Sequence, residues 1–164
     1  ENVRRFLEAD DGREFFMVNL IRLHPEPVAP PGGGAPAPAR EVLAGYTGPF
    51  MKALLRRAGH PVFAGPAAGR YLEQWNVAPD PGWTFSGIIR YRSRRDMLEL
   101  ATNPFFEPAH AFKIAAIDST FAFPVTPAWL PFGPRVGEGA GLLLLAALVH
   151  LALLLWRGAG AAAV

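Results

Sequence analysis

The chain has 164 residues, no cysteine and a formal net charge of +2. Without cysteine there is no disulfide framework and no thiol nucleophile. All 14 acidic residues and 15 of the 16 Lys and Arg lie before residue 140, which leaves that part at only +1, so nucleic acid is a poor partner. The length suits one compact domain and one membrane span.

The first third of the chain predicts a helix, a strand and a long loop. Residues 2–9 favour a short helix, and the nearly continuous apolar run 14–23 predicts a central strand covered on both faces. Asn19 within it is expected to satisfy a backbone group rather than to act in catalysis. Residues 25–38 hold six prolines and three consecutive glycines, which indicates a surface loop. No Lys and Ser or Thr follow these glycines, which disfavours a phosphate cradle.

Residues 40–125 predict three helices and three strands. Helical spacing marks residues 40–58, and residues 61–74 read as a strand interrupted at Gly65 and resuming at 70–72. Clean alternation over 83–91 predicts its hairpin partner. Ser93 resembles the start of a capping box for a helix through 101. A second helical stretch, 105–117, precedes a last strand at 120–125.

The C-terminal part predicts a membrane anchor. Residues 127–139 are a proline-rich connector with aromatic side chains suited to a membrane surface. Residues 140–156 carry no charge, and at ~1.5 Å per residue they would span ~26 Å as a helix. A single transmembrane helix is therefore expected over 140–157, followed by a short tail, 158–164. His150, its one strongly polar side chain, needs a partner in the bilayer.

The run from Ala146 to Arg157 resembles the membrane helix of light-harvesting antenna β polypeptides of purple phototrophic bacteria. The resemblance implies that Ala146 lets a macrocycle approach the helix, that His150 is the axial ligand of a bacteriochlorophyll magnesium, and that Trp156 is an interfacial aromatic. The family continues with proline and tryptophan where this chain has Gly158. A hydrogen bond from His150 to a neighbouring protein helix, and haem or another metal, remain open alternatives.

The element order β-α-β-β-α-β predicts an α+β, ferredoxin-like domain over residues 1–126. The segment NPFFEPAHAF before TFAFP, with Tyr46 and the hairpin, resembles the dimeric α/β-barrel superfamily. In that superfamily two sheets often join into a barrel. Its members include monooxygenases, isomerases and haem enzymes, so the resemblance does not choose an activity.

The soluble part offers no diagnostic catalytic motif. Six polar side chains are candidates, and none of them forms a pair with metal-ligand spacing: His60, Tyr71, Arg90, Glu107, His110 and Asp118. Each also has a structural explanation. The arginines at 90, 92, 94 and 95 are expected to form a solvated edge, with anionic head groups or an acidic partner as the alternative.

These observations lead to two hypotheses. The preferred one is a non-catalytic accessory subunit of a photosynthetic reaction-centre and light-harvesting complex, stabilising it through the transmembrane helix and a cytoplasmic domain. Its partners would be antenna and reaction-centre polypeptides and the lipid bilayer. Its location would be the bacterial inner membrane, with a periplasmic C-terminus. The alternative is a membrane-tethered enzyme of the dimeric α/β-barrel class, monooxygenase- or isomerase-like, acting on a small hydrophobic substrate.

Overall fold

The structure, a computed structural model, describes residues 1–104, 106–128, 141, 143–151 and 153. It divides into two compact units, Glu1–Thr126 and Pro127–Val164. The predicted connector, apart from 127 and 128, and the predicted tail lie outside the described residues, and so do Trp156 and Arg157.

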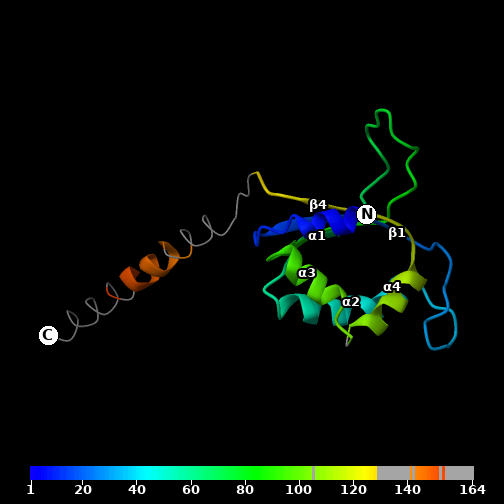
Figure 1. Cartoon of the computed structure of the whole chain (residues 1–164), viewed down its shortest axis with the longest axis horizontal. Helices are drawn as coiled ribbons and strands as arrows, with labels where there is room; N and C mark the ends of the chain where they lie inside the picture. The colour runs from blue at the N-terminus through cyan, green and yellow to red at the C-terminus, as the bar shows by residue number, and fades with distance from the viewer. Residues whose placement is uncertain (105, 129–140, 142, 152, 154–164) are drawn as a thin grey trace. The chain divides into compact units, whose positions relative to one another are not determined.

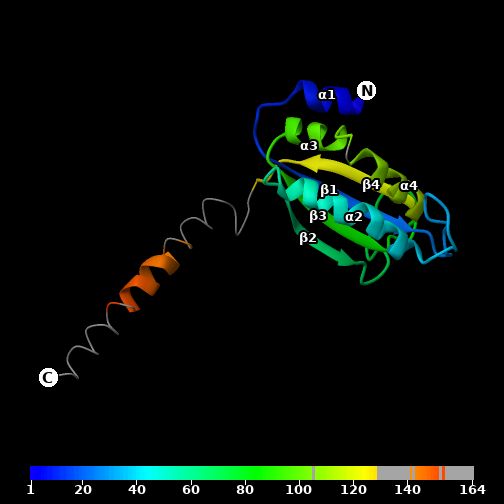
Figure 2. The same ribbon diagram turned by 90° about the horizontal axis from the view of Figure 1, so that it is seen from below.

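The first unit is built on a four-stranded antiparallel sheet with strand order β2-β3-β1-β4. Its strands are β1 (Phe15–Leu23), β2 (His60–Pro66), β3 (Phe85–Tyr91) and β4 (Ile117–Val125). The helices are α1 (Asn2–Glu8), α2 (Ala39–Leu55), α3 (Arg94–Ala101) and α4 (His110–Ala116), with a short 3-10 turn, η1 (Glu107–Ala109). Helices α2, α3 and α4 lie on one side of the sheet (Figures 1 and 2). The α+β, ferredoxin-like fold is confirmed.

The core lies between the sheet and these helices. Phe15 and Met17 of β1 pack with Phe50 and Leu54 of α2, so the odd-numbered residues of β1 face the helices. Leu54 is 1% exposed. A second cluster joins Val42 of α2 to the end of α4. Burial of this apolar surface, more than helix propensity, holds the short helices in place.

Local signals place several elements as predicted. The Ser93 side chain accepts a hydrogen bond from the Asp96 N–H, 3.1 Å, which caps α3. The second helical stretch begins later than expected, because residues 107–109 form the 3-10 turn with Pro108 near its start. The proline-rich loop is ordered by a bridge in which Val28 and Ala37 exchange backbone hydrogen bonds of 2.9 and 3.0 Å.

The other side of the sheet has no helix of the first unit over it and carries apolar side chains. Cross-strand partners share a face, so Val18 and Leu20 lie on this side with Phe123 and Phe121. The same side holds Ile88 of β3 and Phe63 of β2. We call this the open face. Phe63, Phe121 and Phe123 are 54%, 56% and 40% exposed.

The connection from β2 to β3 is longer than predicted. Strand β2 ends at Pro66, and the expected resumption at residues 70–72 is wrong, because there the chain runs alone, away from the sheet. The Ala67 N–H donates to the Thr84 carbonyl, 3.0 Å, and closes the base of the loop. Residues 67–84 rise from the sheet on the side away from α2, α3 and α4, as the green loop of Figure 1. We call this segment the arm.

The second unit contains helical residues at 141, 143–151 and 153, all of them exposed. Among the described residues, no helix is both long and apolar enough to cross a bilayer. The prediction of a transmembrane helix over 140–157 is contradicted on these residues, and so is the predicted inner-membrane location.

Candidate active site

Three side chains able to carry a proton meet on the helix side of the sheet. Tyr46 lies on α2, while His110 and Lys113 lie on α4. The ring centroids of Tyr46 and His110 are 5.9 Å apart, and Lys113 Nζ lies 5.4 Å from the centroid of the Tyr46 ring. Both Tyr46 and Lys113 are partly buried. These three residues form the candidate site.

Aromatic side chains surround the three. Phe50 stacks on Tyr46 at 5.4 Å, and Phe106 meets the His110 ring edge-on at 4.7 Å. Phe106 is also 5.4 Å from Tyr46. The polar groups are therefore surrounded by apolar aromatic side chains.

Helix geometry explains how α4 contributes two of the three. Residues three apart lie on the same helix face, so His110 and Lys113 both point toward α2. The two helices come close because α2 has Gly45 opposite Phe112. A Cβ at Gly45 would lie 2.5 Å from Phe112 Cδ1, closer than real side chains pack. The glycine thus allows α4 to bring its polar face against Tyr46.

Burial shifts the pKa values of Lys113 and Tyr46 in opposite directions. It lowers the pKa of Lys113, because the ammonium loses hydration. It raises the pKa of Tyr46 to about 12, so the phenol keeps its proton. The pKa of nearby Tyr91 is also raised, chiefly by burial and further by the charge of Tyr46. A lysine shifted toward the neutral amine beside a protonated phenol forms a base and acid pair.

The sheet beside the site is partly uncovered. Asn19 shares the face of Phe15 and Met17, and its register partner Ala122 is exposed. The Asn19 amide donates to the carbonyls of Met17, 3.0 Å, and Gly87, 3.3 Å. That is the backbone-satisfying role expected from the sequence. The exposure of Ala122 shows that solvent reaches the helix-facing side of β4.

Of the six candidates from the sequence, only His110 enters this site. His60 is exposed, and its Nδ1 lies 3.2 Å from the Pro61 carbonyl oxygen. Arg90 forms an ion pair with Glu14, 2.6 Å, and donates to the Ala58 carbonyl, 2.7 Å. These contacts hold the end of β3 and are structural.

The remaining three candidates are also dispersed. Asp118 of β4 forms an ion pair with Arg22 of the neighbouring strand β1, 3.3 Å. The Tyr71 hydroxyl accepts a hydrogen bond from Trp83 Nε1, 2.9 Å, within the arm. Glu107 is exposed at the start of η1. The sequence analysis missed Lys113, although its three-residue spacing from His110 was a usable signal.

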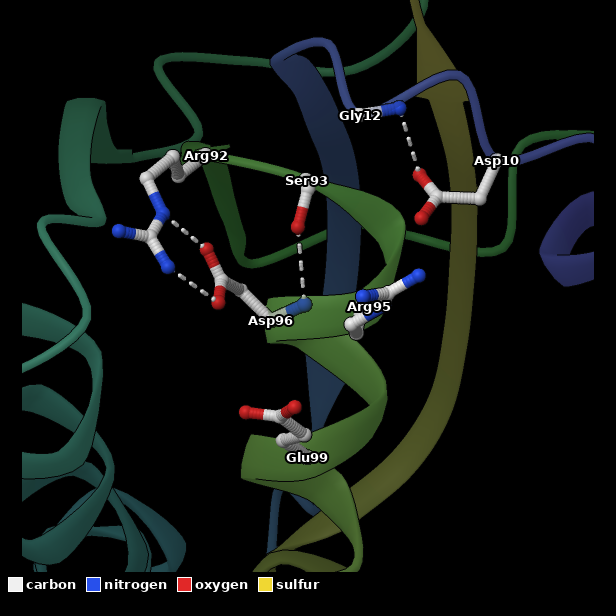
Figure 3. Close-up of a pocket in the computed structure, with 7 residues that line it drawn as sticks. All are labelled: Asp10, Gly12, Arg92, Ser93, Arg95, Asp96 and Glu99. Atoms are coloured by element: carbon white, nitrogen blue, oxygen red, sulfur yellow. Dashed lines mark hydrogen bonds and ion pairs between the residues drawn. The ribbon is translucent and has the colours of Figure 1, made fainter.

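A surface depression lies at the start of α3 (Figure 3). Arg92 holds Asp96 with two hydrogen bonds, 2.6 and 2.9 Å, and this pairing lowers the pKa of Asp96. Asp10 and Glu99 also line the depression, so the positive charges of its arginines are balanced by carboxylates. Nearby, Arg94 donates to the Phe6 and Ala9 carbonyls. Arg94 thus joins α1 to α3, while Arg92 fixes Asp96 within α3, so both arginines support the fold.

The predicted pigment ligands are not brought into a described site. Ala146 and His150 are exposed on the helix of the second unit, while Trp156 lies outside the described residues. Within the described part of the chain, no group of three His, Asp or Glu could hold a metal ion. The assignments of Ala146, His150 and Trp156 to bacteriochlorophyll therefore stay predictions without a test.

Comparison with known proteins supports the fold. No protein-family model and no curated protein matches the chain. Among solved structures it is similar to a protein of unknown function from Rhodopseudomonas palustris, with 23% identity and a TM-score of 0.62 over 77% of this chain and 92% of that one. At this identity the likeness shows the fold alone.

Two weaker likenesses are to other small proteins. One is a dimeric protein of unknown function and ferredoxin-like fold from Bacteroides fragilis, with 14% identity, a TM-score of 0.40, and 70% and 96% of the two chains covered. The other is SnoaB, a cofactor-independent oxygenase from Streptomyces nogalater, with 18% identity, a TM-score of 0.43, and 73% and 97% covered. TM-scores this low say nothing about chemistry.

These comparisons correct the preferred hypothesis from the sequence. The similar structure with a TM-score of 0.62 is a protein of unknown function, the described residues contain no helix long and apolar enough to cross a bilayer, and no likeness to light-harvesting polypeptides was found. The prediction of a non-catalytic photosynthetic accessory subunit is wrong, as are the antenna and reaction-centre partners expected for it. The error arose because a leucine-rich helix with one histidine is a short pattern that unrelated chains share.

Proposed function

We propose that this chain is an enzyme of the α/β-barrel type that moves a proton on a small hydrophobic substrate. The observation that carries the proposal is the contact of Tyr46, His110 and Lys113 within an aromatic wall. The Lys113 amine, in the unprotonated form that its lowered pKa favours, accepts a proton from a carbon beside a substrate carbonyl, which leaves an enolate and an ammonium. The Tyr46 phenol donates a hydrogen bond to the enolate oxygen, and His110 offers a second proton carrier at the same wall.

We also propose that two copies of the chain pair sheet to sheet, and the open face supports this pairing. Its exposed phenylalanines form an apolar surface of the kind that marks protein contacts. A second copy supplies an identical surface, so a two-fold pair covers both faces at once. In the pair each protomer keeps its own site on the helix side.

Exchange of solvent deuterium into an enolisable ketone tests the proton transfer. With 2-tetralone in heavy water, mass spectrometry should show exchange faster in the presence of the protein than in buffer. General acid–base groups contribute roughly 100- to 10,000-fold, so Lys113→Met should lose at least about 100-fold. Exchange no faster than in buffer contradicts the proposal.

The chain offers a matched control. Its only other lysine is Lys52, which is exposed on α2. The Lys52→Met variant removes the same charge from the same class of element and should keep the wild-type exchange rate. An equal loss in both variants would show that the effect is not specific to the buried amine.

A further inference from the structure

We propose that the arm, residues 67–84, extends across the pair and packs its apolar end on the open face of a second copy of this chain. The inference rests on the proposed pairing of two copies and names the arm as the segment that stabilises this pair. Its basis is that the arm rises on the side of the sheet away from α2, α3 and α4 (Figure 1), which is also the side of the open face, and that both carry exposed apolar side chains.

The base of the arm is held by hydrogen bonds. Asp80 accepts from the N–H groups of Tyr71, 2.8 Å, and Gly82, 2.7 Å, and these bonds lower the pKa of its carboxyl. Thr84 donates its N–H to the Ile21 carbonyl, 2.8 Å, which ties the base to β1. A segment held in this way loses less conformational freedom when it binds than a free loop would.

The end of the arm is apolar and uncovered. Leu72 is 101% exposed, Trp75 is 77% exposed and Val77 is 59% exposed. Between the last two, Asn76 has φ of 49°, a left-handed conformation that asparagine tolerates and that turns the chain there. Tryptophan is among the residues most enriched at the energetic centres of interfaces. Three such side chains on one projecting loop indicate a contact surface.

The area of the open face shows why the arm is needed. Its three exposed phenylalanines, each about half covered, offer roughly 300 Å². A standard interface buries about 800 Å² on each partner. The arm's leucine, tryptophan and valine add roughly 400 Å², which brings the total near that size. Because the arms leave each protomer toward the partner's side, a two-fold axis lets both arms engage at once.

Photo-crosslinking tests where the arm lies. In the full-length chain, Trp75→p-benzoylphenylalanine should crosslink to residues 117–125 of a second copy. Mixing 15N-labelled and unlabelled chains identifies such products as intermolecular by mass. The same photo-reactive residue at Val3, which is 66% exposed on α1, the helix that contacts α3, should give no crosslink to that strand. The inference is overturned if Trp75 crosslinks only to residues of its own chain, the C-terminal segment included. It is also overturned if the crosslinks to the second copy miss the open face.

The dissociation constant of the pair separates this inference from the proposed function. By analytical ultracentrifugation, Trp75→Asp should weaken self-association by at least about tenfold, while Val3→Asp should not change it. Suppose that Phe121→Asp separates the protomers and Trp75→Asp does not. The pairing then stands, and the role of the arm is refuted. Loss of lysine-dependent exchange in a protein that still pairs through the arm would instead overturn only the enzymatic proposal. A wild-type chain that stays monomeric at all concentrations overturns the inference outright.

Discussion

Replacing Gly45 by alanine tests whether the close approach of α2 and α4 builds the site. The added Cβ would lie 2.5, 2.7 and 2.9 Å from three ring atoms of Phe112, and the ring is partly buried. Overpacking of this kind costs about 1–3 kcal/mol. Alanine also favours the helix over glycine by about 1 kcal/mol. The net expectation is a loss of about 0–2 kcal/mol in the free energy of unfolding.

A double-mutant cycle isolates the contact. In a Phe112→Ala background the ring is absent, so Gly45→Ala should then stabilise the protein by about 1 kcal/mol. The coupling between the two positions, measured by urea denaturation, should be about 1–3 kcal/mol. Deuterium exchange into 2-tetralone should fall for Gly45→Ala alone, since α4 moves His110 and Lys113 away from Tyr46. Additive effects of the two substitutions would refute the close-approach argument.

Two further predictions concern charge. Asp96→Asn should lower the free energy of unfolding by about 1–2 kcal/mol at neutral pH. Arg92 lowers the pKa of Asp96 in the folded state, so the ion pair stabilises the protein at pH values above about 3.9, the pKa of an aspartate in the unfolded chain. This stabilisation is lost as the pH falls through the lowered pKa. Urea denaturation should therefore show a smaller difference between the wild type and Asp96→Asn at pH 3 than at neutral pH. Lys113→Met should raise the free energy of unfolding at neutral pH, since it removes a charge that burial disfavours. The gain should fade as the pH rises through 10.5, the ordinary lysine value, where the wild-type amine is neutral in both states.

Much of the fold could be predicted from the sequence because local and tertiary signals agree there. Alternation over residues 83–91 placed β3, and the Ser93 hydroxyl placed the start of α3. In β1, the apolar run correctly indicated a central strand, but the expected cover on both faces is wrong, because one of those faces is the open face. Such agreement between local preference and packing is what makes an element readable from one sequence.

The errors fall where long-range contacts decide the outcome. Residues 70–72 look like a strand, but the Asp80 carboxylate binds the Tyr71 N–H and competes with sheet pairing. The environment of Lys113 depends on how close α4 comes to α2, which a helical pattern does not show. The C-terminal run satisfied the local rules for a span, yet among the described residues no helix is long and apolar enough to cross a bilayer. A single histidine in leucines was too short a pattern to identify a family.

The most direct test of the account is the titration of the two lysines by NMR after reductive 13C-methylation. With only Lys52 and Lys113 in the chain, a Lys52→Arg variant assigns the two lysine signals. The account predicts that Lys113 titrates at a distinctly lower pH than Lys52, because burial lowers its pKa. If both lysines titrate together at the ordinary value, the site holds no activated base and the proposed proton transfer is contradicted.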